Sequence, residues 1–127
     1  FYIFVKSSPT PDNLLLLVSD HVNGKFERVE GFDDSMGAQT KGMYEAPTAV
    51  KLADGRWCLF ADFYGAGCAG QGYVPFVSDD LTKGVFTRAD EAFHFPYGFK
   101  HGTILPITEE EYERMLARDW TDVPDLR

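Results

Sequence analysis

One glutamate at the start of a strand-like segment is the residue of this sequence best placed to do chemistry. Glu45 follows Tyr44 and precedes Pro47, and residues 48–52 then alternate in character. A period of two predicts a β-strand, and proline is tolerated near a strand start because that position need not donate to the ladder. A glutamate there can point into a cleft, where burial raises its pKa and makes it a proton donor. The alternative is a solvated carboxylate, the common state of charged residues.

A second candidate is an aromatic stretch at residues 92–100. It contains four aromatic side chains with a histidine and a proline, namely Phe93, His94, Phe95, Pro96, Tyr97 and Phe99. Such a stretch either forms a rim on which sugar rings stack or belongs to the core and an ordered loop, and the second is the commoner arrangement. The rim interpretation makes Phe99 a candidate substrate contact.

The two cysteines indicate neither a disulfide framework nor a metal quartet. Cys58 lies in an apolar segment and is expected to be a small core residue. Cys68 lies in a glycine-rich loop and is a candidate free thiol. The cellular compartment stays undecided.

Length and composition describe one small soluble globular segment. The chain has 127 residues, 44% of them hydrophobic and 15% aromatic, and its net charge is −8. Nucleic-acid binding needs clustered Lys and Arg, which an acidic chain with scattered basic residues does not offer. No apolar run approaches the ~20 residues of a membrane helix. The sequence opens on Phe1 with no methionine, so we expect the natural protein to be longer.

Strands dominate the elements that the sequence predicts. They are expected at residues 1–5, 14–19, 26–29, 43–52, 57–62, 73–78, 85–88 and 100–107. Loops are expected at 31–42 and 65–72, and Asp54-Gly55 predicts a tight type I′ hairpin turn. Thr108 followed three residues later by Glu111 is a capping box, which predicts a helix from 109 to about 118.

Two segments of the chain repeat. Residues 18–28 resemble residues 77–88, with a Ser-Asp turn and a trailing Phe-x-Arg, and each follows an aromatic strand. Their spacing of about 60 residues suits the four-stranded blades of a β-propeller. Chance similarity is the alternative, since Ser-Asp turns are common. The repeat predicts an all-β fold, a partial propeller with a short C-terminal helix.

Three motifs resemble glycoside hydrolase family 43, five-bladed β-propeller enzymes that act on arabinose- and xylose-containing glycans. They are Tyr44-Glu45-Ala46-Pro47-Thr48, the blade from Asp54-Gly55-Arg56-Trp57 to Tyr73-Val74-Pro75-Phe76-Val77-Ser78-Asp79-Asp80-Leu81, and His101-Gly102-Thr103-Ile104-Leu105-Pro106-Ile107-Thr108. The resemblance covers most of the chain. It implies that the whole of residues 1–127 is the C-terminal part of one propeller domain, about two and a half of its blades. The blade repeats would be about 1–42 and 43–92, closed by a strand and helix at 100–118.

The resemblance also implies roles for individual residues. Glu45 matches the general acid, with Ala46 where glycine is usual in the family. His101 matches a histidine at the propeller axis, which contacts substrate or a structural calcium ion. Its alternative is a histidine satisfied by hydrogen bonds near the axis. Tyr44 and Phe99 complete the expected substrate contacts.

Inversion at the anomeric carbon needs a second carboxylate as general base. The family takes this base and a pKa-tuning aspartate from earlier blades, and neither motif occurs here. Asp62, Asp79 and Asp80 sit at expected strand ends, where blade turns suit them better than a base would. We therefore expect the chain to supply only the acid, to be inactive alone, and to associate with the rest of its propeller or with other copies.

Two functions remain open from the sequence. The first is the C-terminal portion of an inverting glycosidase that acts on an oligo- or polysaccharide. The second is a non-catalytic carbohydrate-binding or structural β-module, in which Glu45 and the aromatic residues only contact sugar.

Overall fold

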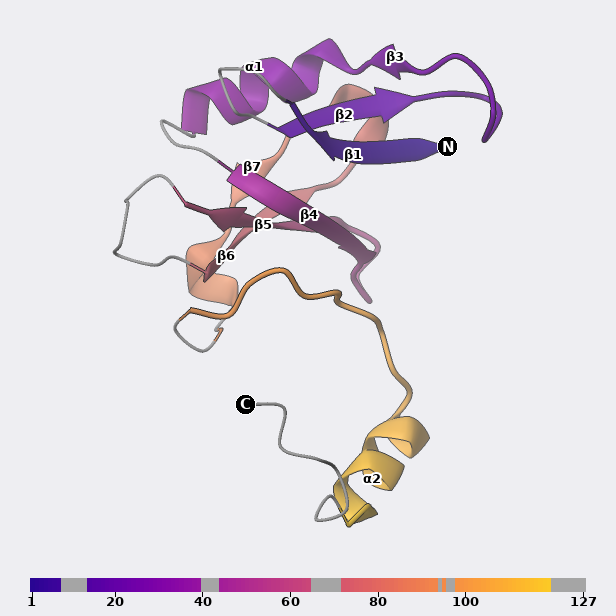
Figure 1. Ribbon diagram of the computed structural model, residues 1–127, viewed down its shortest axis with the longest axis vertical. Helices are drawn as coiled ribbons and strands as arrows, with labels where there is room; N and C mark the ends of the chain where they lie inside the picture. The colour runs from indigo at the N-terminus through magenta and orange to yellow at the C-terminus, as the bar shows by residue number, and fades with distance from the viewer. Residues whose placement is uncertain (8–13, 40–43, 65–71, 94, 96–97, 120–127) are drawn as a thin grey trace.

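A computed structural model of the protein describes residues 1–7, 14–39, 44–64, 72–93, 95 and 98–119. These residues are mostly β, and they form two antiparallel sheets and two α-helices without a closed barrel (Figure 1). The first sheet has the order β1-β2-β3, from the strands β1 (Tyr2–Lys6), β2 (Leu14–Val18) and β3 (Glu27–Arg28). The second has the order β4-β5-β6-β7, from β4 (Tyr44–Lys51), β5 (Trp57–Phe63), β6 (Gly72–Ser78) and β7 (Thr87–Arg88).

The two sheets end in hairpins of the same register, as the sequence repeat predicts. In the first sheet Val18 lies opposite Glu27, and the amide of Val29 donates to the carbonyl of Leu16 over 2.9 Å. In the second sheet Val77 lies opposite Thr87, and the amide of Ala89 donates to the carbonyl of Pro75, also over 2.9 Å. Strands β1, β2 and β3 therefore correspond to β5, β6 and β7.

The turn between β4 and β5 is a hairpin, but its type differs from the prediction. Gly55 has φ +91°, and its amide donates to the carbonyl of Leu52 over 3.0 Å. A type I′ turn needs positive φ at both central residues, and Asp54 is not at positive φ. The carboxylate of Asp54 instead accepts from the amide of Arg56 over 3.0 Å, which supports a type I turn followed by a left-handed glycine.

Helix α1 (Glu30–Gln39) occupies a segment that the sequence predicted to be a loop, and that prediction is wrong. Phe32 and Met36, one turn apart, are both buried. The ring of Phe32 makes edge contacts with Phe4 of β1 and with Phe86, at centroid distances of 5.7 and 5.4 Å. The Ser35 hydroxyl donates to the carbonyl of Phe86 over 2.7 Å. The helix is therefore stabilised by tertiary packing, which often outweighs weak local propensity.

The predicted strand at residues 100–107 is also wrong, because the described chain has no strand there. His101 has φ +54°, which interrupts an extended run, and its amide donates to the carboxylate of Asp62 rather than to a ladder. Ile104 still packs against the cluster of Cys58, Phe60 and Tyr73. The segment therefore crosses the second sheet as irregular backbone.

The predicted C-terminal helix is confirmed as α2 (Glu109–Ala117), with Thr108 and Glu111 forming both bonds of the capping box. None of its residues is buried, and it lies apart from both sheets (Figure 1). Two short 3-10 turns, η2 (Leu81–Lys83) and η3 (Asp90–Ala92), complete the described elements. Neither described helix is both long and apolar enough to cross a membrane.

Burial separates two apolar segments of the first sheet and confirms one expectation. Phe1, Tyr2 and Ile3 are exposed, whereas Leu14 and Leu16 of β2 are buried. Those leucines belong to the main core between the sheets and α1. Cys58 is fully buried, as predicted, and burial raises its pKa to about 11. Cys68 lies outside the described residues.

Candidate functional site

Glu45 is placed by an irregularity at the start of β4. It lies directly opposite Asp62 of β5, and the register then shifts between Glu45 and Thr48. Ala46, within this bulge, has φ +46°. Residues directly opposite in an antiparallel pair project on the same face of the sheet, so the two carboxyl groups share a face. The bulge thus aims the glutamate, a frequent use of bulges beside active sites.

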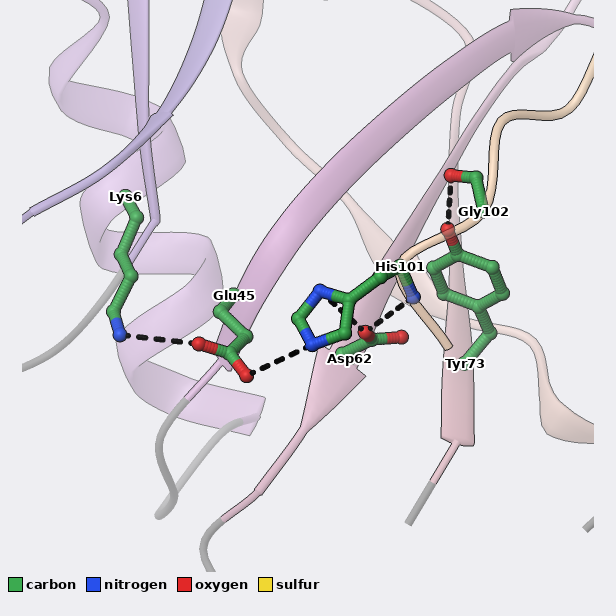
Figure 2. A network of polar contacts seen from close by, with 6 residues as sticks. All are labelled: Lys6, Glu45, Asp62, Tyr73, His101 and Gly102. Atoms are coloured by element: carbon green, nitrogen blue, oxygen red, sulfur yellow. Dashed lines mark hydrogen bonds and ion pairs between the residues drawn. The ribbon is translucent and has the colours of Figure 1, made fainter. Parts of the chain in front are cut away.

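A lysine from the other sheet approaches one oxygen of Glu45. The Nζ of Lys6, at the end of β1, lies 3.3 Å from Glu45 Oε2 (Figure 2). The same ammonium lies 4.6 Å from the centroid of the Tyr64 ring. The hydrogen bond with Tyr64, followed by the one with Glu45, raises the pKa of Lys6, so it is charged. The Glu45 side chain is 25% exposed and therefore reachable from solvent.

The imidazole of His101 approaches the other oxygen of Glu45. Its Nε2 lies 3.6 Å from Glu45 Oε1, and its Nδ1 lies 3.5 Å from Asp62 Oδ2. The backbone amide of His101 donates to the same Asp62 oxygen over 2.8 Å. The histidine therefore stands between the two carboxyl groups, as Figure 2 shows. Its backbone amide is hydrogen-bonded to Asp62, and its ring nitrogens lie near both carboxyl groups.

Asp62 lies inside the molecule, and its assignment to a blade turn is wrong. Its side chain is 1% exposed, and it lies on the central strand β5, paired with Glu45 of β4 and with Tyr73 of β6. Burial raises its pKa, against the opposing effects of the His101 amide and the charges of His101 and Lys100. Its Oδ1 has no hydrogen-bond partner among the described residues. Asp80 does lie in a turn, where it accepts from the amide of Thr82 over 2.9 Å.

The sequence carried a signal for Asp62 that the turn interpretation missed. The residue continues the apolar run Trp57–Ala61 and is followed directly by Phe63 and Tyr64. Turns that contain aspartate commonly have Gly, Pro or Asn as its neighbour, and none of these is adjacent to Asp62. A charged residue within a continuous apolar strand is a candidate for a buried functional group.

The aromatic stretch divides between core and surface. Phe93 and Phe95 make edge contacts with the buried Phe60, at centroid distances of 5.1 and 5.2 Å. Phe99 stacks on Phe95 at 5.9 Å and is 44% exposed. The hydroxyl of Tyr73, whose pKa is raised by burial, donates to the carbonyl of Gly102 and ties this stretch to β6. His94, Pro96 and Tyr97 lie outside the described residues.

Tyr44 lies in the core beneath the site. It is 3% exposed and packs against Phe63 and Phe76 at centroid distances of 5.2 and 5.7 Å. Burial raises its pKa. The structure thus brings Glu45 and His101 together, keeps Phe99 accessible, and places Tyr44 where it supports β4. Contact of Tyr44, His101 or Phe99 with substrate stays a prediction.

The described residues do not assemble a calcium site around His101. Calcium takes six to eight oxygen ligands, often from several carboxylates. Among the described residues there is no group of three or more His, Cys, Asp and Glu side chains that could hold a metal ion. The two carboxyl groups nearest in the network are already engaged by Lys6 and His101. A metal contact of His101 stays a prediction.

Chemically, the arrangement presents one accessible carboxyl group, that of Glu45, with Lys6 beside one oxygen and His101 beside the other.

A family model related to glycoside hydrolase family 43, described as a probable glycosyl hydrolase domain, matches residues 1–113. This agrees with the resemblance drawn from the three motifs. No curated protein and no solved structure matches the chain.

Proposed function

Since the chain belongs to the family of probable glycosyl hydrolase domains related to glycoside hydrolase family 43, we propose that it carries the general acid of an inverting glycosidase. The acid is Glu45, and the substrates are arabinose- or xylose-containing glycans. The observation that carries this proposal is the position of Glu45, at the start of β4 with a partly exposed carboxyl group held between Lys6 and His101.

The proposed chemistry needs two carboxyl groups. Glu45 donates its proton to the leaving glycosidic oxygen, while a carboxylate ~6.5–9.5 Å away activates a water molecule on the opposite face of the sugar. Asp62 is unsuited to that second role, because its side chain is buried and bonded to His101. The resemblance assigns the base to an earlier blade, so we place it outside this chain, and the 127-residue chain alone should give no turnover of aryl glycosides.

A partial β-propeller is the fold that this proposal implies. The matching registers of β2–β3 and β6–β7 support it, since successive blades of a propeller repeat one hairpin geometry. The four-stranded sheet would be one blade, and the three-stranded sheet would be the outer part of the blade before it. The rest of the propeller, or other copies of the chain, would then cover the remaining faces. A structural calcium ion at the axis would need ligands from outside the described residues.

One observation favours a second candidate, a non-catalytic carbohydrate-binding module. Lys6 Nζ, 3.3 Å from Glu45, is an ion-pair partner for a carboxylate. A carboxylate accepts hydrogen bonds from sugar hydroxyl groups but has no proton to donate. In this function Glu45 and the exposed ring of Phe99 would only hold a sugar.

The replacement Glu45→Gln in the full-length protein separates the two functions. Aryl arabinofuranosides and xylosides are compared, with a phenyl and with a dinitrophenyl leaving group. Loss of a general acid should lower kcat/KM by about 10²–10⁴-fold for phenyl, whose leaving oxygen is the more basic, and far less for dinitrophenyl. Glu27→Gln is the matched control, because Glu27 also pairs with a lysine at 3.3 Å but is 72% exposed on β3. Equal losses on both substrates would contradict the acid role.

A further inference from the structure

Asp62 and His101 are held together in a way that the proposed acid chemistry does not explain. The Asp62 side chain is 1% exposed, and an ionised carboxylate is costly to bury without partners. Among the described residues, its Oδ2 has polar contacts with His101 alone, with the backbone amide at 2.8 Å and with Nδ1 at 3.5 Å. The two residues are 39 positions apart in the chain. A buried carboxyl group thus links two segments that are distant in the chain.

The backbone of His101 adopts an uncommon conformation that its contacts with Asp62 support. Its φ of +54° lies in the left-handed region, which few residues with a Cβ atom adopt, although histidine does so more often than most. The imidazole is 57% exposed, so packing alone does not fix it. Nearby, the Tyr73 hydroxyl bonds the carbonyl of Gly102, the next residue, and anchors the same turn from β6.

We propose that Asp62 is a positioning residue, which holds His101 in its left-handed turn with Nδ1 toward Asp62 and Nε2 toward Glu45. A carboxylate only accepts hydrogen bonds, so the 3.5 Å approach of Nδ1 to Asp62 Oδ2 favours the neutral ring that carries its hydrogen on Nδ1. His101 then contacts Oε1 of Glu45 while Lys6 contacts Oε2. Together they fix the orientation of the Glu45 carboxyl group.

The consequence for catalysis rests on the proposed function. A proton donor must be aimed at the leaving oxygen, and misplacement by about 1 Å can cost 10²-fold in rate. Loss of Asp62 should therefore lower kcat on the phenyl glycosides while KM changes little, because Asp62 itself is too deeply buried to touch a sugar. A residue with only a structural role would instead change stability or expression and leave the dependence on leaving group unaltered.

Two replacements separate positioning from folding. Asp62→Leu has a similar shape and removes the buried charge together with the acceptor oxygen, so the fold should be kept. Asp62→Asn keeps an oxygen that can accept from the His101 amide and from Nδ1. We expect about a tenfold or larger loss of kcat on phenyl glycosides for Leu. For Asn we expect a rate close to that of the wild type. If the Leu variant does not fold, Asp62→Ala, which also removes the acceptor, is measured in its place.

A second measurement does not depend on activity. The ¹⁵N signals of the histidine rings report which nitrogen carries the hydrogen, and His101→Ala assigns the signal of His101. We expect the Nδ1–H form in the wild type and the Asn variant, and a shift toward Nε2–H or a mixture in the Leu variant. The exposed turn residue His21 should not change in any of them.

The outcomes distinguish failure of this inference from failure of the proposed function. If the Leu variant keeps the His101 signal and the leaving-group dependence of the wild type, Asp62 does not position His101. If the signal changes as expected but the full-length wild-type protein hydrolyses no glycoside, Asp62 positions His101 and the proposed glycosidase function is wrong. A changed signal with unchanged kcat would overturn the link from His101 to Glu45.

Discussion

Ala46 adopts a backbone conformation that glycine adopts more readily. Its φ is +46°, and it follows Glu45 in the bulge where the β4–β5 register shifts. For an L-residue with a Cβ atom the left-handed region costs roughly 1–2 kcal/mol. Glycine, which has no Cβ atom, adopts such a φ without this cost. The conformation aims the glutamate, and Ala46 maintains it under strain.

The replacement Ala46→Gly should therefore be neutral or should raise the free energy of unfolding by up to about 1 kcal/mol, because relief of strain exceeds the conformational entropy that glycine loses. Ala49→Gly is the matched control in the same strand, at an ordinary φ. It should lower the free energy of unfolding by about 0.5–1 kcal/mol. Urea unfolding of both variants measures the difference. Equal destabilisation of the two would show that Ala46 is unstrained.

At the scale of elements, α1 and α2 are stabilised in different ways. Helix α1 has weak local signals and is held by the burial of Phe32 and Met36 and by the bonds of Ser35 with Phe86. Helix α2 has a complete capping box, and none of its residues is buried. The first helix should therefore unfold with the sheets, and the second should unfold locally.

The replacement Thr108→Ala tests this independence, because it removes the N-cap of α2. It should destabilise the helix by about 1 kcal/mol. Hydrogen exchange of the amides in residues 109–117 should become faster, while the midpoint of sheet unfolding stays the same. Thr103→Ala, outside the helix, is the control and should change neither. A fall in the unfolding midpoint of the sheets would mean that α2 is coupled to them.

At the scale of the whole molecule, β1 is an edge strand that carries exposed apolar side chains. It pairs with β2 on one side, and Phe1, Tyr2 and Ile3 are 61%, 36% and 39% exposed. Unpaired strand edges and contiguous apolar surface both promote association. The net charge of −8 opposes it through repulsion, which salt screens.

The free chain should therefore associate with increasing protein concentration, and more strongly at high ionic strength. Light scattering over a concentration series measures the effect. Ile3→Lys should weaken association, whereas Val22→Lys, at a position 70% exposed in the β2–β3 loop, should act only through its charge. A cooperative monomer at every concentration would contradict both the association and the partial propeller from which it was predicted.

Local patterns in the sequence were enough to predict much of this protein. The strands of both sheets, the hairpin at 52–56, the repeated hairpins and the helix at 109–117 each depend on alternation, turn residues or a cap. These features act between residues close in the chain, so a sequence displays them directly. The motif around Glu45 likewise marked the candidate acid, and together with the two later motifs it indicated the family that the family model shows.

Only the tertiary structure decided what surrounds Glu45. Lys6 and Glu45 are 39 residues apart, as are Asp62 and His101, and no period or spacing relates either pair. The helix at 30–39 and the irregular path of 100–107 were also decided by partners distant in the chain, Phe86 and Asp62 respectively. Such contacts depend on how whole sheets pack, because burial and hydrogen-bond satisfaction are settled jointly by all elements that meet there. The sequence therefore favoured a turn at Asp62, whereas the packing of the sheets places Asp62 inside β5 and beside His101.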